Sequence, residues 1–245
     1  MKNIKSIVKE NYGQIATNSG SCCGGGSCCS GSLPDLSKFI GYTDEQLNNV
    51  PEGANLGLGC GNPLALATLK SGEKVLDLGS GAGFDVFLAA RKVGSTGKVI
   101  GVDMTKEMIQ KAKENAVNGK FTNVDFHLGD IEDLPVESET IDAIISNCVI
   151  NLAPNKDKVF AEAYRVLKPG GRLMISDVVL SKELPENLKH DNALLTGCVS
   201  GAILKDNYLK ILNEAGFKDI TITKEVPMFL EEYALSISFT AIKSN

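Results

Sequence analysis

The 245-residue sequence lacks several features that define large classes of proteins. It contains no apolar run of 18 residues, so no segment is predicted to span a membrane. It has no block rich in lysine and arginine, and its net charge is −5, which disfavours a nucleic-acid-binding face. The first ten residues are charged and lack the apolar core of a secretory signal. We therefore expect a cytoplasmic protein that binds neither nucleic acid nor membrane.

Histidine is also scarce, whereas cysteine is abundant. The two histidines are His127 and His190, against seven cysteines. Because the count is odd, the cysteines cannot all pair within the chain, and cytosolic thiols stay mostly reduced. The composition therefore favours metal binding, redox work or soft-ligand chemistry. The alternative is that some of these cysteines are small apolar core residues.

Short apolar runs alternate with helical patterns from residue 74 onward, which predicts βαβ units and a mostly parallel sheet. The expected strands are 74–78, 98–102, 124–128, 141–146, 172–177, 218–223 and 236–242. The expected helices are 2–11, 44–50 with Thr43 as N-cap, 63–70, 84–93, 105–118, 156–167 and 205–215. The last pair of strands, separated by a loop carrying Pro227, could close the sheet with one antiparallel strand. Residues 14–33 read as a flexible loop rich in Gly, Ser and Cys.

A glycine-rich loop, Asp77-Leu-Gly-Ser-Gly-Ala-Gly83, joins the first strand to the next helix. Glycines at such a turn allow a ligand to approach the backbone closely. Asp103 ends the second strand, where a carboxylate can accept hydrogen bonds from both ribose hydroxyls of an adenosine. The alternative is that Asp103 caps the helix that begins at Thr105.

This loop departs from the dinucleotide fingerprint, because its third glycine comes one residue early and Phe84 takes the expected place. It resembles motif I of class I methyltransferases. The resemblance extends to the acidic loop at 129–135, whose aspartate would hold the adenine amino group, and to the turn at 167–173. It implies a Rossmann-like α/β fold with a seven-stranded, mostly parallel sheet flanked by helices, the last strand antiparallel. The implied S-adenosylmethionine-binding residues are Tyr12, Asp77, Gly79, Ser80, Gly81, Gly83, Asp103, Met104, Asp130, Ile131 and Asn147.

Cys148 directly follows the fourth strand, at the carboxyl edge where ligands of open α/β sheets bind. Cys60 and Cys198 also lie in polar contexts rich in glycine or asparagine. Three thiolates suit a soft, pyramidal ion such as As(III), whose free lone pair is a nucleophile that needs no general base. The alternative for Cys148 is core packing inside the strand.

At this point the sequence resembles the arsenite methyltransferases over nearly its whole length. The matching segments are 55–63, 77–85, 145–152 and 197–202. The resemblance implies that Cys60, Cys148 and Cys198 bind arsenic as substrate, either as arsenite or as its thiol conjugates. It also implies a thiol reductant, such as glutathione or thioredoxin, and thioredoxin as a partner.

The resemblance further implies a catalytic cysteine in the amino-terminal region, which here carries two vicinal pairs, Cys22–Cys23 and Cys28–Cys29. Cys22 and Cys23 are the candidates for this role, and the residues do not decide which thiol takes it. The pairs could capture arsenite, relay it or form a disulfide after turnover. The alternative is a tail of little consequence.

We expect three regions: residues 1–54 as helix, cysteine-rich loop and cap, 55–180 as the cofactor-binding core, and 181–245 as the part that completes the arsenite site and the sheet. Two other functions remain open. The chain could methylate a small carbon or oxygen acceptor such as a quinone ring, although such an enzyme has no use for three edge cysteines. It could instead sequester a thiophilic metal or metalloid without turnover, although a cofactor loop is then unexplained.

Overall fold

The computed structural model describes residues 4–17, 37–38, 40–62, 68–189, 199, 201–228, 230 and 232–244. Its centre is one seven-stranded sheet with the order β3-β2-β1-β4-β5-β7-β6. The strands are β1 (Lys74–Leu78), β2 (Lys98–Asp103), β3 (Val124–Leu128), β4 (Ile141–Asn147), β5 (Leu167–Leu180), β6 (Phe217–Pro227) and β7 (Ala234–Lys243). The first five strands pair in parallel, and β7 is antiparallel to both β5 and β6. The expected Rossmann-like fold class is confirmed.

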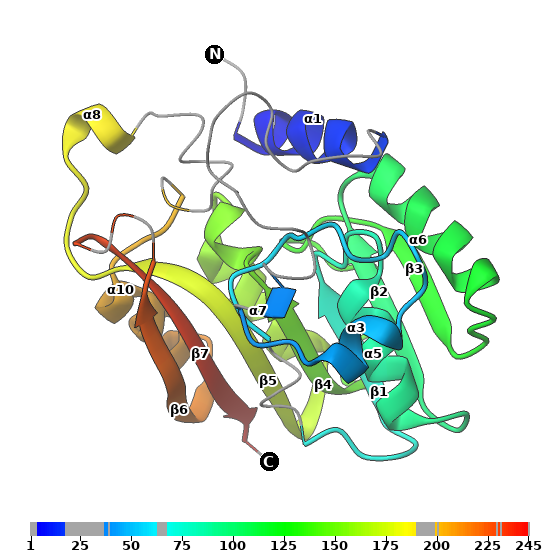
Figure 1. Ribbon diagram of the computed structural model, residues 1–245. Coiled ribbons are helices and arrows are strands. Elements are labelled where there is room, and N and C mark those ends of the chain that lie inside the picture. The colour runs from blue at the N-terminus through cyan, green and yellow to red at the C-terminus, as the bar shows by residue number, and fades with distance from the viewer. Residues whose placement is uncertain are drawn as a thin grey trace.

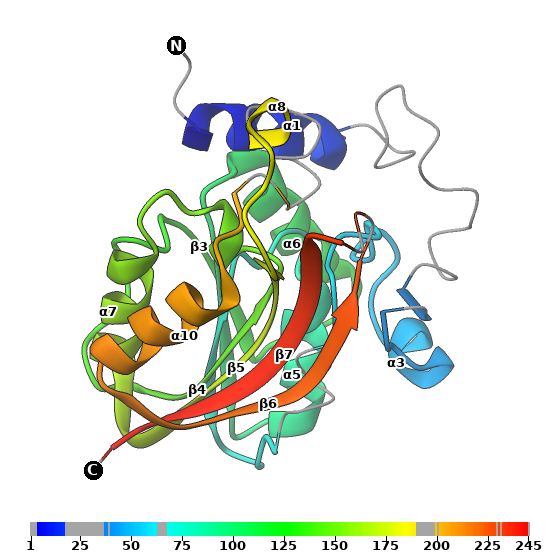
Figure 2. The ribbon, with the colours of Figure 1, turned by 90° about the vertical axis from the view of Figure 1, so that its left-hand side faces the viewer.

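Helices cover both faces of this sheet. On one face lie α5 (Phe84–Val93) and α6 (Lys106–Asn118), and on the other lie α7 (Lys156–Val166) and α10 (Lys205–Glu214), as Figure 2 shows. The strands between them are buried on both sides, which is why β1 and β4 read as nearly continuous apolar runs. Shorter elements are α3 (Asp44–Asn48), η1 (Ile150–Leu152) and α8 (Glu186–Lys189).

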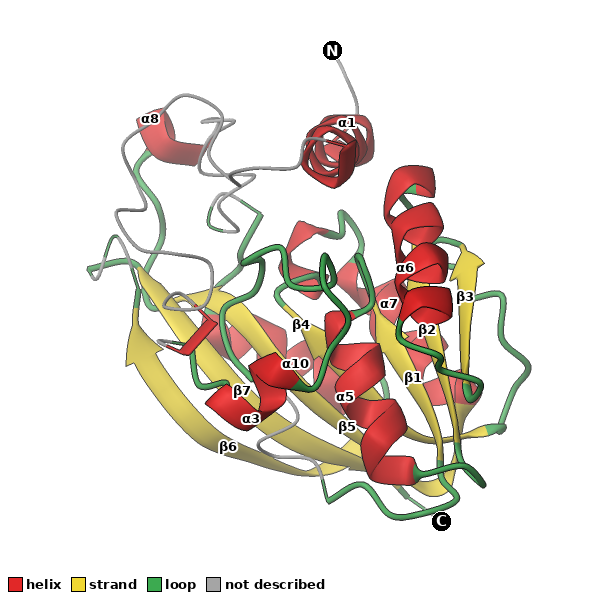
Figure 3. Ribbon diagram, turned by 45° about the vertical axis from the view of Figure 1, so that its right-hand side comes forward, coloured by secondary structure: helices red, strands yellow, loops and turns green. Residues whose placement is uncertain are grey.

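The amino-terminal helix α1 (Ile4–Thr17) lies across one end of the sheet (Figures 1 and 3). This end carries the carboxyl termini of the parallel strands, because Lys5 of α1 forms an ion pair with Asp130, which follows β3. Lys111 of α6 also donates a hydrogen bond to the carbonyl of Ala16. Among the residues that the structure describes, no helix is both long enough and apolar enough to cross a bilayer.

Most predicted elements agree with the structure to within about two residues, and the capping box of α3 at Thr43 is present. Four boundaries were wrong, one of them the end of β5, which lies at Leu180 instead of residue 177. Helix α1 runs on to Thr17, and strand β5 begins at Leu167, with four residues bulged out between its pairings with Ile141 and Ala143. Pro227 ends strand β6 instead of lying in the loop. The helix expected at 63–70 falls largely outside the described residues.

Candidate active site

A cleft opens at the carboxyl edge of the parallel strands, directly beneath α1. It encloses about 1080 Å³ of space, including its open mouth. Its walls come from α1, the segment 54–59, and the turns that follow β1, β2, β3 and β4. Segments that are far apart in the sequence therefore meet at one place, as expected for an open α/β sheet.

The glycine-rich loop forms the floor of the cleft. Gly79 has a φ of +70°, and a Cβ atom there would lie 2.4 Å from the Val149 side chain. Gly81 has a φ of +50°, a Cβ atom there would make only an ordinary contact with the Met108 sulfur at 3.9 Å, and its backbone N–H donates to Asp103. Gly83 precedes α5, where a Cβ atom would meet the rings of Phe87 and Phe126 at 2.8 and 2.9 Å. Gly79 and Gly81 line the cleft, whereas Gly83 serves close packing below it.

Asp103 joins the glycine-rich loop to the start of α6. One carboxylate oxygen accepts the N–H of Gly81 at 2.9 Å, and the other accepts the N–H of Thr105 at 2.8 Å. Burial raises the pKa of Asp103, and these two donors oppose the rise. The side chain also lines the cleft. Asp103 therefore supports the helix start and faces the ligand space at the same time, and Thr105 occupies the N-cap without a side-chain cap bond of its own.

The acidic loop after β3 brings Asp130 and Ile131 into the cleft wall. Asp130 is bridged by Lys5 of α1 at 2.6 Å, and Glu132 by the same ammonium group at 2.9 Å. Burial acts to raise the pKa of Asp130, but Lys5 and the backbone N–H of Glu132 outweigh it, so the pKa is lowered. Asp130 is thus held as a carboxylate beneath α1.

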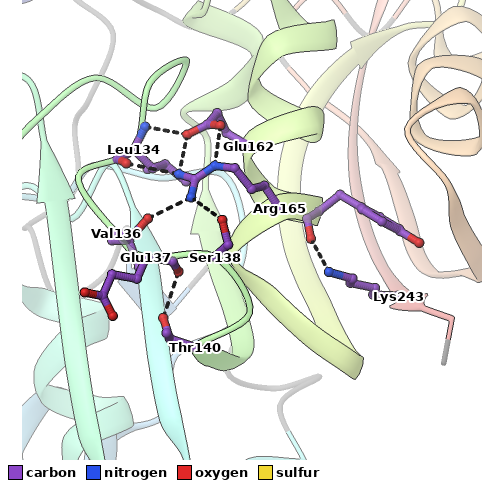
Figure 4. Close-up of polar contacts among 9 residues, drawn as sticks. Leu134, Val136, Glu137, Ser138, Thr140, Glu162, Arg165 and Lys243 are labelled. Atoms are coloured by element: carbon purple, nitrogen blue, oxygen red, sulfur yellow. Dashed lines mark hydrogen bonds and ion pairs between the residues drawn. The ribbon is translucent and has the colours of Figure 1, made fainter.

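Two residues of α7 hold this acidic loop in place (Figure 4). The guanidinium of Arg165 donates to the carbonyls of Leu134 and Val136 at 3.2 and 3.0 Å. The carboxylate of Glu162 pairs with Arg165 and accepts the N–H of Leu134 at 2.8 Å. The loop is therefore fixed by a bidentate ion pair rather than by regular secondary structure.

Two buried polar groups at the floor are in environments that buried polar groups rarely occupy. The Ser80 hydroxyl is buried and has no hydrogen-bond partner in the described part of the chain. Asp77 is also buried, and its pKa is raised well above the ordinary range by burial and by the negative charges of Asp85 and Asp103. Such groups favour a polar ligand at this floor.

Cys148 leaves β4 in a strained backbone conformation. Its φ is +59°, which is uncommon for a residue other than glycine and is often found at functional sites. Its N–H donates to the carbonyl of Ser176 on the neighbouring β5 at 2.8 Å. The turn places Cys148 beyond the strand and in the cleft wall, although its side chain is only 6% exposed.

Cys60 comes from the loop between α3 and β1 and is held against Cys148 by three polar contacts. The N–H of Cys60 donates to Oδ1 of Asn147 at 3.1 Å, and the carbonyl of Gly61 accepts from Nδ2 of Asn147 at 2.7 Å. The Ser236 hydroxyl of β7 donates to the carbonyl of Cys60 at 2.7 Å. A side chain at Gly59 would collide with Asn147 at 2.8 Å, so glycine permits this close approach.

Asn147 is itself fixed by a buried pair of residues that the sequence did not reveal. Its Nδ2 donates to the Tyr42 hydroxyl at 2.8 Å, and Tyr42 donates to Asp85 at 2.7 Å. Burial raises the pKa of Asp85 to about 6, against the effect of these two donors. The Tyr42 ring also packs edge-on against Phe84, which lines the cleft where a dinucleotide fingerprint would have glycine.

Asp177 on β5 is a further residue that the sequence reasoning missed. One of its carboxylate oxygens and the sulfur atoms of Cys60 and Cys148 all lie within 4.8 Å of one another, and all three residues are buried. Asp177 ends the predicted strand 172–177, beside the strand that leads to Cys148. A charged residue in an apolar strand was the signal that could have identified it.

The remaining predicted residues divide into two groups. Tyr12, Met104 and Asn147 line the cleft with the residues described above. Five of the seven cysteines lie outside the described residues: Cys22, Cys23, Cys28, Cys29 and Cys198.

Comparisons with known proteins agree with this architecture. Residues 69–216 match the family described as "Methyltransferase domain". An arsenite methyltransferase from Halobacterium salinarum is 50% identical over 227 residues, covering 89% of this chain and 58% of the relative. One from Aquipseudomonas alcaligenes is 38% identical, covering 94% and 66%. The chain therefore spans about three fifths of the length of these relatives.

A solved structure extends the likeness to three dimensions. The crystal structure of an arsenic(III) S-adenosylmethionine methyltransferase from Chlamydomonas reinhardtii is 31% identical, with a TM-score of 0.70. The match covers 89% of this chain and 75% of that one. The chain belongs to the methyltransferase domain family and, within it, to the group that includes the arsenite methyltransferases.

Proposed function

We propose that this protein transfers methyl groups from S-adenosylmethionine to trivalent arsenic held by cysteine thiolates. The observation that carries the proposal is the meeting of Cys60 and Cys148 at the carboxyl edge of the sheet, with Cys148 in the wall of the cleft. Neither a carbon nor an oxygen acceptor calls for two adjoining thiols. A soft metalloid does, because thiolates are its preferred ligands.

The cleft fits S-adenosylmethionine in its chemistry. The carboxylate of Asp103 would accept the ribose hydroxyls, and Asp130 would accept the adenine amino group. The buried Ser80 hydroxyl would offer a polar partner at the floor. Tyr12, Met104, Ile131 and Asn147 would contribute further contacts. When bound, this molecule supplies an electrophilic methyl group on a sulfonium.

The residues of the chain would act mainly by positioning. Cys60 and Cys148, with Cys198 as the proposed third ligand, would hold arsenic so that its lone pair faces the cleft. That lone pair would form the new As–C bond, and the electron pair of the broken C–S bond would leave with the sulfur. No general base is required, in keeping with the absence of histidine from the cleft wall among the described residues. Orientation of this kind can account for a large part of the lowering of the activation barrier for methyl transfer.

Each transfer oxidises arsenic from the trivalent to the pentavalent state, so a further methylation requires a reductant. We propose a thiol such as glutathione or thioredoxin, with Cys22 or Cys23 taking part in the redox cycle. The proposed compartment is the cytoplasm, where thiols persist. Arsenite or its thiol conjugates would be the substrate, and arsenic detoxification the role. The names of the relatives from two prokaryotes and an alga support this assignment.

The test is incubation of the full chain with S-adenosylmethionine, arsenite and glutathione, followed by chromatographic detection of methylated arsenicals. We expect methylated arsenic from the wild type and none from Cys148→Ser, with S-adenosylmethionine binding by that variant unchanged. Full activity of Cys148→Ser would remove the ligand assignment. Arsenite binding without methylation would favour a sequestering protein, and methylation of a quinone ring instead would favour the carbon-acceptor alternative.

A further inference from the structure

Asp177 is a carboxylate buried beside the two thiols, and arsenic chemistry gives it no role as a ligand. Its side chain is completely buried. The thiol sulfurs of Cys60 and Cys148 and one Asp177 oxygen lie within 4.8 Å of one another. Arsenic(III) prefers an all-sulfur set, whereas two thiolates and one carboxylate together suit a borderline divalent ion.

The three groups are brought together by the sheet rather than by a local turn. Strands β4 and β5 pair in parallel with Asn147 opposite Ser176, so the next residues, Cys148 and Asp177, lie side by side. Cys60 is fixed against them by Asn147 and by Ser236. The donor atoms therefore come from three rigidly held segments, which favours a preformed site.

The carboxylate keeps capacity for a further partner. Asp177 accepts hydrogen bonds from the Tyr208 hydroxyl, the Asn151 N–H and the Val178 N–H, at 2.9, 3.0 and 2.9 Å. Within the part of the chain that the structure describes, these occupy three of the about four lone-pair positions that a carboxylate offers. Burial raises the pKa of Tyr208 well above its ordinary range, with the charge of Asp177 adding to it, so the phenol remains a donor that orients the carboxylate.

The surroundings also supply a compensating positive charge. Lys156 is buried and donates to the carbonyls of Asn151, Ala153 and Gly201 at 3.0, 3.0 and 2.9 Å. Its positive charge favours the ionised form of the Asp177 carboxyl group. Two thiolates and one carboxylate around a divalent cation carry a net charge of −1, which this ammonium group would offset.

We propose that Cys60, Cys148 and Asp177 form a binding site for a borderline divalent cation of the Zn²⁺ type. In a tetrahedral Zn²⁺ site, sulfur and oxygen ligand atoms are separated by about 3.5–3.8 Å. The present spacing of up to 4.8 Å needs only a small contraction to reach that geometry. The fourth position is open for water or another thiolate. Because the ion would occupy both thiols, it would exclude arsenite. This exclusion of arsenite rests on the proposed function, whereas binding of the ion does not.

The test is a competition titration of Zn²⁺ against a chromophoric chelator, with a non-chelating reductant present. It uses the full chain with the amino-terminal cysteines replaced by serine, so that their thiols do not compete for zinc. These cysteines are Cys22, Cys23, Cys28 and Cys29. We expect one bound Zn²⁺ and an affinity at least about tenfold lower in Asp177→Asn. Asp125→Asn, which changes a partly exposed aspartate on β3, should bind like the parent. Arsenite binding should survive in Asp177→Asn.

X-ray absorption of the Zn²⁺-loaded parent protein adds a measurement that does not depend on the variant folding. We expect a ligand shell that contains two sulfur atoms and at least one oxygen. No bound zinc, an all-sulfur shell, or an unchanged affinity in Asp177→Asn would each overturn the proposal. Failure of the zinc-free wild-type chain to methylate arsenite would instead overturn the proposed function and leave the zinc site standing.

Discussion

The backbone N–H of Cys60 donates a hydrogen bond to Oδ1 of Asn147, the residue immediately before Cys148. One amide side chain therefore sets the position of one thiol relative to the other, across 87 residues of sequence. The same side chain donates to Gly61 and Tyr42, so its orientation is fixed from three directions.

Replacing Asn147 with Ala should disturb the spacing of the thiols more than the fold. The change leaves the Cys60 N–H and the Gly61 carbonyl without their partner, at a cost of about 1–3 kcal/mol of unfolding free energy. We expect kcat/KM for arsenite methylation to fall by about tenfold to a hundredfold, since small displacements of reacting groups have large effects on rate. Chemical denaturation and product analysis provide the measurements.

Asn213→Ala is the matched control, because this asparagine is exposed on α10 and its side-chain amide donates to the carbonyl of Leu209 within the same helix. It should leave both quantities unchanged. Equal activity of Asn147→Ala and the wild type would show that the amide does not position Cys60.

Replacing Asp103 with Ala should weaken S-adenosylmethionine binding while arsenite binding remains. The variant loses a carboxylate that faces the cleft and leaves the N–H groups of Gly81 and Thr105 unpaired. A charged hydrogen bond is worth about 1.5–3 kcal/mol, which predicts a Kd at least about tenfold higher. Isothermal titration calorimetry measures both ligands, and an unchanged cofactor Kd would mean that Asp103 acts only at the helix start.

Alanine substitutions at Gly79 and Gly81 distinguish the cost of backbone strain from the cost of a steric collision. Gly79→Ala places a methyl group 2.4 Å from Val149, whereas Gly81→Ala meets only the Met108 sulfur at 3.9 Å. Both positions have positive φ, which costs about 1–2 kcal/mol for alanine. We expect Gly81→Ala to lose about that much stability and Gly79→Ala to lose distinctly more, as measured by urea denaturation. Similar losses would imply that Val149 moves aside at no cost.

Asp85 should make stability fall as the pH rises from about 4 to 6. Its pKa is raised from 3.8 to about 6 in the folded protein, so between these values the native state binds more protons than the unfolded chain. The stabilisation from Asp85 is then fully present below the pKa of the unfolded chain. It is lost as the pH rises through the folded pKa, which lowers the unfolding free energy by about 3 kcal/mol in total. In Asp85→Asn this contribution is absent.

The measurement is urea denaturation of the wild type and Asp85→Asn at a series of pH values. The difference between their unfolding free energies should change across this window in the stated direction. Asp206→Asn, a change in the first turn of α10, serves as the control and should run parallel to the wild type. A pH-independent difference for Asp85→Asn would contradict the assignment.

The strands and most helices could be predicted because burial on both sides of the sheet leaves continuous apolar runs in the sequence. The boundaries that were wrong depend on tertiary contacts. Pro227 is tolerated in β6 because β6 lies at the edge of the described sheet, where it pairs with β7 on one side. The early start of β5 at Leu167 requires pairing with Ile141, which no local pattern specifies.

Part of the site could be predicted from the same apolar strand patterns. Cys148 was placed at the carboxyl edge because it follows a recognisable strand. The approach of Cys60 could not be foreseen, because its loop has no periodicity and is positioned by Asn147 and Ser236. Asp177 was missed because the neighbouring order of β4 and β5 becomes visible only in the assembled sheet.

The hydrogen bond from Ser236 to Cys60 spans 176 residues, and this separation has a consequence for synthesis on the ribosome. At about 5–20 residues per second, roughly ten to thirty seconds pass between the polymerisation of Cys60 and that of Ser236. During the second half of this interval, after Cys148 has been added, both thiols are already made while the strand that fixes Cys60 is not. The two-cysteine site is therefore among the last parts of the molecule to take shape, and its thiols first meet the metals and oxidants of the cell on a nascent chain.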